Sequence, residues 1–332
     1  MLRFSYLILP VAAAAAALSW YLIGLYARTM QAAQKLEAPN PRSMHKVPIP
    51  VGAGVAIVAT ILVLSPWWRY DAFGPHLTLL ACLGGLGALS WIDDRRGLPA
   101  AVRLAAQAAA VALCLAWLPA EARVLPFVPL SAERLLEGLA WLWFINLFNF
   151  MDGIDGLAGS ETLAVGLGYL ALIAFAGLGG GPWRLVLVVA AATAGYLAWN
   201  WHPAKVFMGD AGSIPLGFAL GWVMLDLALR GLWAAGLILP LYFVADATLT
   251  LLMRAARGEK PWQAHRQHFY QRAVLAGTPP PGVVWRVGAV NAALVVLALV
   301  STTHPVAALI SALVVVAGLL AHLENLARRN PS

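Results

Sequence analysis

Charged residues are scarce in this chain. Asp, Glu, Lys and Arg make up 11% of its 332 residues, against about a quarter in an ordinary soluble protein. Hydrophobic residues make up 61%, and the mean hydropathy is +0.77. The composition therefore excludes a soluble domain, which could not bury so much apolar surface. The apolar runs are continuous rather than alternating, which excludes a transmembrane β-barrel.

Cysteine is almost missing as well. Cys82 and Cys114 both lie inside apolar runs, so the chain has neither a disulfide framework nor a cysteine-based zinc site. It also has no nucleic-acid-binding motif, and we expect no nucleic-acid partner. The class that remains is a helical protein of the membrane.

Eleven apolar segments approach the length of a membrane-spanning helix, about 17 to 25 residues. They are residues 4–26, 49–66, 74–92, 100–118, 136–151, 158–177, 183–200, 212–230, 232–253, 282–301 and 304–323. We predict an all-α, polytopic integral membrane helical bundle of about 10–11 transmembrane helices, with residues 1–332 forming one transmembrane domain. The first segment is too long for a signal peptide and is expected to be a retained span. A short surface helix is expected at residues 131–137, which begins in the long outer segment 119–135.

The distribution of basic residues predicts the orientation. If the N-terminus lies outside, 16 of the 22 Lys and Arg residues fall on the inner side. Cytoplasmic loops carry such an excess. The inner loops are then residues 27–48, 92–99, 152–157, 201–211 and 254–281, and they contain the polar motifs described below. We therefore expect the catalytic loops to face the cytoplasm.

Polar side chains at steps of three residues come directly after Trp141–Ile145, at the end of the fifth apolar segment. They are Asn146, Asn149, Asp152 and Asp155, accompanied by Gly153 and Gly156. Residues three apart share one face of a helix. Acids at membrane depth are costly, so their presence there usually marks a functional site. We interpret this stretch as a functional site, the alternative being hydrogen bonding of buried Asn between helices.

A pair of acids, Asp93-Asp94, ends the third segment. The helix dipole disfavours acids at a helix C-terminus, so a cation is expected beside them, and Mg²⁺ is a natural candidate. The alternative is an ordinary solvated helix end.

The loop before the eighth segment contains Gly209, Asp210 and Gly212. Asp210 can supply an oxygen to a hard cation. The glycines and the start of the next helix are expected to offer free backbone N–H groups to phosphate. The loop lacks the GxxxxGK pattern of a P-loop, and an ordinary glycine-containing turn remains the alternative.

The last inner loop is basic and contains His265, Arg266 and His268. Its alternative interpretation is a surface that binds anionic lipid. A zinc site is disfavoured, because no cysteine or third histidine lies nearby. Acidic and basic loops at one membrane face suit a divalent cation, a diphosphate and a second, lipid-borne anion. Phosphoryl transfer requires this combination of positioning and charge neutralisation.

Five segments together carry a family resemblance. They are Arg42–Lys46 with Pro48–Gly54, Asp93-Asp94, Asn146–Ala158, Pro203–Gly217 and His265–Gln271. In these segments and their order the chain resembles the polyprenyl-phosphate N-acetylhexosamine-1-phosphate transferases of the glycosyltransferase 4 family. The resemblance implies a Mg²⁺-dependent phosphotransferase. This enzyme would transfer N-acetylhexosamine-1-phosphate from a UDP-N-acetylhexosamine to undecaprenyl phosphate and release UMP.

The resemblance also implies site residues. Asp210 and Asn149 match the metal ligands, for Mg²⁺ or Mn²⁺. The residues matched to catalysis are Asp93, Asp94, Asp152, Lys46, His265 and His268. The residues matched to substrate binding are Asn146, Asp155, Asn200, Phe207 and Arg266, with Phe207 placed against the uracil ring. The implied setting is the bacterial inner membrane, in contact with membrane lipid, with a homodimer as one assembly.

The histidine segment bears on the branch of the family. The lipid I-forming phospho-muramoyl-pentapeptide translocases carry three adjacent histidines, whereas this chain has His265-Arg-Gln-His268 followed by Phe-Tyr-Gln. This form resembles the O-antigen-initiating branch, whose donors are UDP-GlcNAc or 6-deoxy sugars such as UDP-FucNAc and UDP-QuiNAc. The translocase remains an alternative. So do an intramembrane aspartyl protease, because Gly209-Asp210 forms a Gly-Asp pair, and a proton-coupled transporter.

Overall fold

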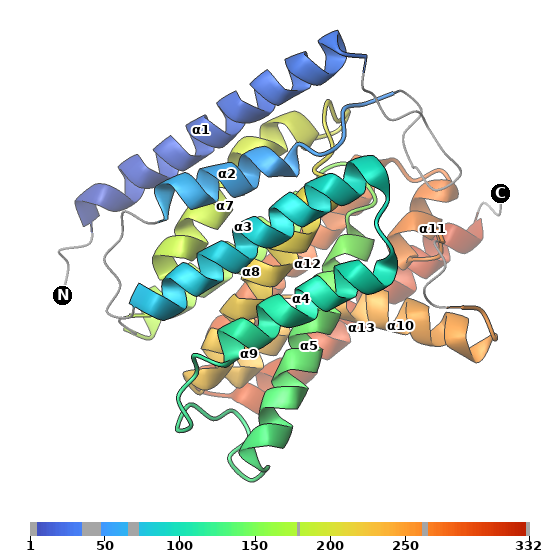
Figure 1. Cartoon of the computed structure of the whole chain (residues 1–332). Coiled ribbons are helices and arrows are strands. Elements are labelled where there is room, and N and C mark those ends of the chain that lie inside the picture. The colour runs from blue at the N-terminus through green and yellow to red at the C-terminus, as the bar shows by residue number, and fades with distance from the viewer. Residues whose placement is uncertain (1–4, 35–47, 66–72, 178–179, 261–264, 330–332) are drawn as a thin grey trace.

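The computed structural model describes residues 5–34, 48–65, 73–177, 180–260 and 265–329. Within these ranges it contains thirteen α-helices and no β-strand (Figure 1). The helices are α1 (Ser5–Ala32), α2 (Gly54–Leu64), α3 (Phe73–Arg96), α4 (Ala100–Leu115), α5 (Leu130–Met151), α6 (Leu157–Phe175), α7 (Trp183–Asn200), α8 (Asp210–Leu229), α9 (Trp233–Ile238), α10 (Leu241–Ala256), α11 (Phe269–Leu275), α12 (Pro280–Val300) and α13 (Pro305–Arg329). The all-helical fold class is confirmed.

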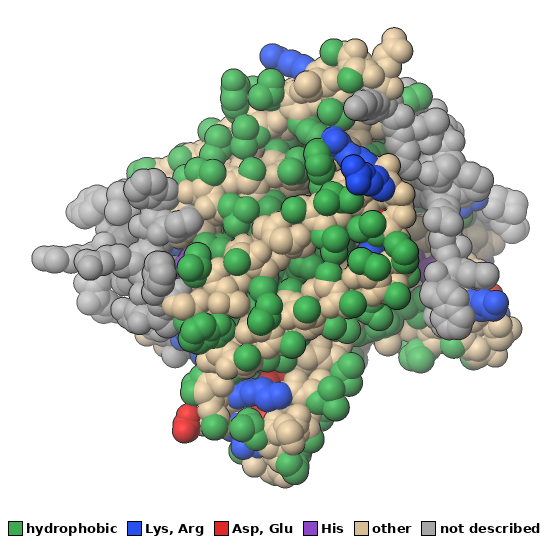
Figure 2. Space-filling view, in the orientation of Figure 1, with side chains coloured by type: hydrophobic (Ala, Val, Ile, Leu, Met, Phe, Trp, Pro, Cys, Tyr) green, Lys and Arg blue, Asp and Glu red, His purple; other side chains and the backbone are tan. Residues whose placement is uncertain are grey.

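Six of these helices are long and apolar enough to cross a membrane: α1, α3, α6, α8, α12 and α13. Figure 2 shows hydrophobic side chains over the middle of one face of the bundle and charged side chains toward its two ends. The chain is therefore a multi-pass membrane protein. The placement of the N-terminus outside remains a prediction.

The span expected at residues 49–66 is only the 11-residue helix α2, and two other expected elements also differ in the structure. The span expected at residues 232–253 is broken, because Pro240 lacks the N–H that would continue α9, and α10 begins only at Leu241. In Figure 1 the C-terminal end of α10 points away from the bundle. The surface helix expected at residues 131–137 is instead the beginning of α5. Glu133 in this first turn accepts the backbone N–H groups of Val124 and Leu125, which holds the preceding loop against the helix.

Helix α8 lies at the centre of the bundle and packs against α2, α3 and α5. Glycines allow this close packing, as is common between membrane helices. A Cβ added to Gly54 of α2 would lie 2.1 Å from the Cα of Gly212 in α8. A Cβ added to Gly217 would lie 3.1 Å from the Cα of Ile145 in α5. The start of α8 is thereby held against its neighbours at the end of the bundle where the expected site residues lie.

Candidate active site

The C-terminal end of α5 meets the N-terminal end of α8 at the centre of the site. The side-chain amide of Asn149 donates hydrogen bonds to Asp210 Oδ1 at 2.8 Å and to Ser213 Oγ at 2.7 Å. The two residues expected to bind metal are therefore adjacent, although 61 positions separate them in the chain.

Arg103 of α4 joins the two acidic segments of the site. Its Nη1 lies 2.9 Å from Asp93 Oδ2 and 3.3 Å from Asp210 Oδ2. The other oxygen of Asp93 accepts the backbone N–H of Leu98 at 2.5 Å. Both oxygens of this buried carboxylate thus have a donor within the protein. The sequence did not identify Arg103 as a site residue, because nothing in the sequence distinguishes it from the other basic residues near the inner loops.

Asp94 occupies the helix start that was expected to bind phosphate. Its two carboxylate oxygens accept the backbone N–H groups of Asp210 and Ala211, each at 3.1 Å. The next two N–H groups, of Gly212 and Ser213, donate to the carbonyl of Gly209. The prediction that these N–H groups are free for phosphate is therefore wrong, because an acid from α3 already caps the helix.

Asp152 and Asp155 lie in the short connection between α5 and α6. Burial, followed by the charges of Asp210, Asp94 and Asp155, raises the pKa of Asp152 to about 7. Asp155 is paired locally, since its Oδ2 lies 2.7 Å from His202 Nδ1 and accepts the backbone N–H of Ala204 at 3.0 Å. One of the two acids is therefore poised to titrate near neutral pH, and the other organises the loop after α7.

Asn146 and Asn200 both make contacts inside the protein. Asn146 donates to Gln107 Oε1 at 2.8 Å and faces α4. Asn200 is buried, accepts the N–H of Gly156 at 2.8 Å and donates to the carbonyl of Val206 at 2.9 Å. These contacts join neighbouring segments, and the expected roles in substrate binding remain predictions.

Phe207 connects the site to the segment before α2. Its backbone N–H donates to the carbonyl of Pro50 at 2.9 Å, and it forms an isolated parallel bridge with Val51. Tyr26 of α1 donates to the carbonyl of Val51 at 2.6 Å. Lys46, the expected catalytic residue that precedes this segment, lies outside the described residues.

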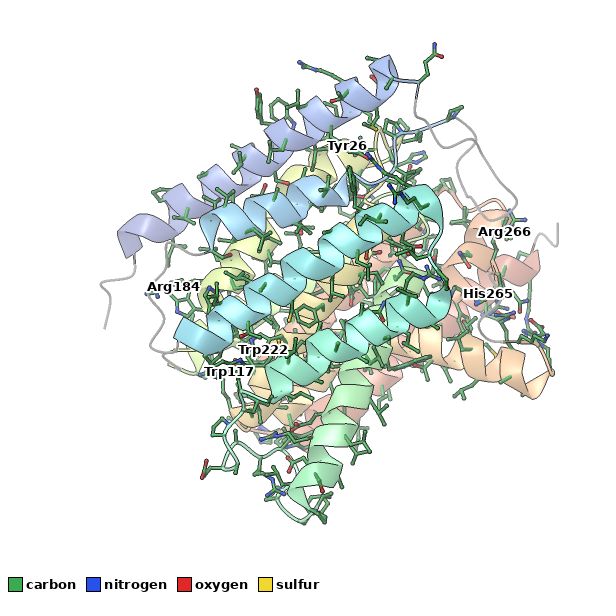
Figure 3. All side chains as sticks on the ribbon, in the orientation of Figure 1. Tyr26, Trp117, Arg184, Trp222, His265 and Arg266 are labelled. Carbon is green, nitrogen blue, oxygen red and sulfur yellow. The ribbon has the colours of Figure 1, made fainter. Side chains whose placement is uncertain are left out.

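The histidine segment lies at the same end of the bundle. Figure 3 places His265 and Arg266 beside α11, far from Trp117 and Arg184 at the other end. Tyr270 of α11 donates to the carbonyl of Phe150 at 3.1 Å and so links this segment to the end of α5.

The two histidines differ in their surroundings. The ring of His265 lies 4.9 Å from that of His268. Burial, then the charges of His268 and Arg254, lower the pKa of His265 to about 4. His265 is thus neutral at pH 7 and accepts the backbone N–H of Gln267 at 3.2 Å. His268 is buried and pairs with Asp246 of α10 at 3.2 Å. Sequence reasoning placed Asp246 in a span but assigned it no role.

The oxygen donors of the site suit a hard divalent cation. Among the described residues, no three His, Cys, Asp or Glu side chains converge on one point. Mg²⁺ does not require such a cage, since it is commonly held by one or two carboxylates, several waters and substrate phosphates. Asp210 with Asn149 fits this arrangement. Arg103, however, competes for one oxygen of Asp210.

Comparison with known proteins finds a family model and relatives that overlap the segments of this site. A model of the family described as glycosyl transferase family 4 matches residues 76–228, which include Asp93, Asn149 and Asp210. The undecaprenyl-phosphate alpha-N-acetylglucosaminyl 1-phosphate transferase of Escherichia coli (strain K12) is 29% identical over 266 residues, covering 73% of this chain and 70% of the relative.

Two further relatives carry two different names. A probable undecaprenyl-phosphate N-acetylglucosaminyl 1-phosphate transferase of Bacillus subtilis is 27% identical over 257 residues, covering 73% of this chain and 70% of the relative. A phospho-N-acetylmuramoyl-pentapeptide-transferase of Thermosynechococcus vestitus is 30% identical over 267 residues, covering 70% of this chain and 66% of the relative. With its helical bundle and its acidic site, the chain belongs to glycosyl transferase family 4 and is a multi-pass membrane transferase.

Proposed function

We propose that this protein transfers N-acetylhexosamine-1-phosphate from a UDP-linked donor to undecaprenyl phosphate. The products are an undecaprenyl-diphospho-sugar and UMP. The observation that carries the proposal is the cluster in which Arg103 and Asn149 both contact Asp210, with Asp93 beside them. This cluster brings an acidic pair and a fixed cation together at the end of a membrane bundle. A lipid-borne phosphate and a nucleotide diphosphate could meet there.

The reaction exchanges one diphosphate linkage for another. An oxygen of the lipid phosphate attacks the phosphorus that carries the sugar, and the bond from this phosphorus to the UMP oxygen breaks. The number of phosphoanhydride bonds is unchanged, so the reaction needs no ATP. The protein then has mainly to position the two substrates and to balance their charge. A divalent cation held by Asp210 and Asn149 would supply positive charge to the diphosphate of the donor.

Asp93 has a positioning role in this proposal. The second pKa of a phosphate monoester is near 6, so the lipid phosphate needs little help to lose its proton at neutral pH. Both oxygens of Asp93 already accept protein donors, from Leu98 and Arg103. We therefore assign Asp93 to holding the guanidinium of Arg103, whose side chain is 41% exposed, toward the acceptor phosphate.

The alternatives differ in what they require of these groups. An aspartyl protease needs two carboxylates that share a proton, whereas Asp93 and Asp210 share a guanidinium. The lipid I-forming translocase remains the second candidate, and the two activities differ in the donor sugar. The single histidines at 265 and 268 favour UDP-GlcNAc, UDP-FucNAc or UDP-QuiNAc over UDP-MurNAc-pentapeptide. The product would then initiate O-antigen or another cell-surface polysaccharide, in the lipopolysaccharide or cell-wall pathways.

The orientation belongs to the proposal as well. The excess of Lys and Arg in the loops around the site supports a site that faces the cytoplasm of a bacterium. The protein would then lie in the inner membrane, where UDP-sugars are available. A homodimer is compatible with this arrangement.

The test is an assay of purified protein in lipid with undecaprenyl phosphate and each of the four UDP-sugars. We expect UMP release that requires the lipid, a divalent cation and one N-acetylhexosamine donor, with Mg²⁺ or Mn²⁺ restoring activity after chelation. Asp210→Ala should abolish UMP release while the protein stays folded in the membrane. UMP release from UDP-MurNAc-pentapeptide alone would identify the translocase. No lipid-dependent UMP release from any donor would refute the proposal.

A further inference from the structure

Asp246 is a buried acid with an unusual number of hydrogen-bond donors. Its side chain is 0% exposed, and it lies on α10, outside the segments that carry the family resemblance. Two donors come from its own helix, and three come from the start of α11 and the residue before it. They are Tyr242 Oη at 3.1 Å, Thr250 Oγ1 at 3.3 Å, His268 Nδ1 at 3.2 Å, and the backbone N–H groups of Phe269 at 3.1 Å and Tyr270 at 3.4 Å.

This arrangement determines which nitrogen of His268 carries a proton. Four of the five groups around Asp246 are hydroxyl or backbone N–H donors, which suits a carboxylate that only accepts. The fifth group, Nδ1 of His268, lies 3.2 Å from the same Oδ1 that accepts the N–H of Phe269. It contributes a favourable contact only if it also donates. His268 is therefore held with a hydrogen on Nδ1, and Nε2 is the nitrogen left for another partner.

The carboxylate also places the histidine relative to the acidic site. It holds the first two N–H groups of α11, and Tyr270 in that helix donates to the carbonyl of Phe150, the neighbour of Asn149. The ring of His268 stacks on Tyr270 at 5.7 Å between centroids. One buried acid therefore sets both the tautomer of His268 and the position of α11 against the end of α5.

We infer that Asp246 is the positioning residue of this site. It holds His268 as the Nδ1–H tautomer, so that Nε2 is presented to the phosphates or the sugar of the donor. The part of the inference that concerns the donor rests on the function proposed above. The part that concerns the tautomer rests on the hydrogen bonds alone.

Variants of His268 separate the two nitrogens. In His268→Asn the side-chain amide occupies the place of Nδ1 and can still donate to Asp246, whereas nothing replaces Nε2. We expect a protein as stable as the wild type, with kcat lower by about 10²-fold or more, the usual size of a lost acid–base or hydrogen-bonding group. Asp246→Asn removes the carboxylate and should lower kcat by about 10- to 100-fold, as the loss of an orienting carboxylate does elsewhere.

The double variant distinguishes positioning from a purely structural role. If Asp246 acts through His268, adding Asp246→Asn to His268→Asn lowers kcat no further, because the histidine is already missing. If Asp246 only supports the fold, the two losses multiply, and this outcome would overturn the inference. Tyr242→Phe is the matched control. It removes one donor from Oδ2 but leaves the Oδ1 contact with His268, and we expect wild-type kcat.

A second measurement does not depend on activity. The full-length protein with ¹⁵N-labelled histidine rings, in lipid nanodiscs, should show His268 with its proton on Nδ1. The signal is identified by its disappearance in His268→Asn. A proton found on Nε2 in the wild type would overturn the inference even if the proposed reaction is correct. An Nδ1 proton in a protein that releases no UMP would instead keep the inference about the tautomer and refute the proposed function.

Discussion

The carboxylate of Asp94 accepts a hydrogen bond from the backbone N–H of Asp210 at 3.1 Å. It also accepts the N–H of Ala211, so the end of α3 caps the start of α8. The adjacent acids Asp93 and Asp94 therefore have different roles in the site. Asp93 contacts the guanidinium of Arg103, whereas Asp94 holds the backbone of the residue expected to bind the metal.

Replacement of Asp94 should separate its capping role from its charge. Asp94→Asn keeps one oxygen that can accept a backbone N–H, whereas Asp94→Ala keeps none. The loss of such a cap costs about 0.5–2 kcal/mol, so we expect Asp94→Ala to lower the Tm and the activity more than Asp94→Asn does. The measurement is thermal unfolding in detergent together with UMP release. Equal activity losses in two variants of unequal Tm would show that the charge of Asp94 matters more than its capping.

Arg103 should oppose metal binding while it supports catalysis. Its guanidinium shares Asp210 with any cation bound there. A half-exposed ion pair is worth about 0.2–1 kcal/mol. We therefore expect Arg103→Ala to lower the half-saturating Mg²⁺ concentration by about two- to fivefold, while kcat falls by about 10²-fold through the loss of a charge that faces phosphate.

Arg96→Ala is the matched control, because Arg96 is an exposed basic residue at the end of the neighbouring helix α3. It should leave both the Mg²⁺ requirement and kcat unchanged. A Mg²⁺ requirement that rises in Arg103→Ala would mean that Arg103 supports the cation site rather than competes with it. Arg103→Lys should recover only part of kcat, because the lysine side chain is shorter and does not bring its ammonium to the place of Nη1, the nitrogen that contacts both carboxylates.

The helices of this protein could be predicted from its sequence because hydrocarbon leaves the chain few choices. Continuous apolar runs must satisfy their backbone groups internally and so form helices. Counting the spans also places Asp93, Asn149 and Asp210 on one side. The span expected at residues 232–253 is wrong because of Pro240. A proline near the middle of an apolar run was visible in the sequence, yet hydropathy alone gives no sign that it divides the run into α9 and α10.

Partnerships between side chains could not be predicted in the same way. Arg103 and Asp246 gain their roles from contacts with other segments of the fold, and their own neighbours in the chain give no hint of those contacts. The start of α8 shows the same limit. Glycines and a helix N-terminus suggest a phosphate site. In the structure, however, Asp94 at the end of α3 accepts the N–H groups of this helix start.

Gly153 provides a test of the contact between α11 and the acidic stretch. A Cβ at this position would lie 2.1 Å from Tyr270 Oη, a distance that forces the two segments apart. We expect Gly153→Ala to lower both the Tm and kcat. Tyr270→Phe alone loses a hydrogen bond worth about 0.5–1.5 kcal/mol. It also makes room for the methyl group that Gly153→Ala adds.

The double variant Gly153→Ala with Tyr270→Phe should therefore be less impaired than the sum of the two single changes predicts. The measurement is the Tm and kcat of all three variants beside the wild type. Strict additivity would show that Gly153 is needed for another reason, such as backbone freedom in the connection between α5 and α6.

Asp152 should make both stability and cation binding depend on pH. Its folded-state pKa is raised from 3.8 to about 7 by burial and by the neighbouring acids, so the folded protein holds this proton more tightly than the unfolded chain does. The stability contributed by the protonated form is fully present below pH 3.8 and is lost as the pH rises through about 7. Without divalent cations, the Tm of the wild type should fall across this window, and Asp152→Asn should reduce the fall.

A bound divalent cation should reverse this fall of the Tm with rising pH, because the cation favours the ionised carboxylate of Asp152. In the wild type the half-saturating Mg²⁺ concentration should decrease between pH 6 and pH 8, as the proton on Asp152 ceases to compete with the positive charge. In Asp152→Asn the requirement should change less over the same range. Parallel pH profiles of the wild type and the variant, in both Tm and Mg²⁺ requirement, would assign the titration to another group of the site.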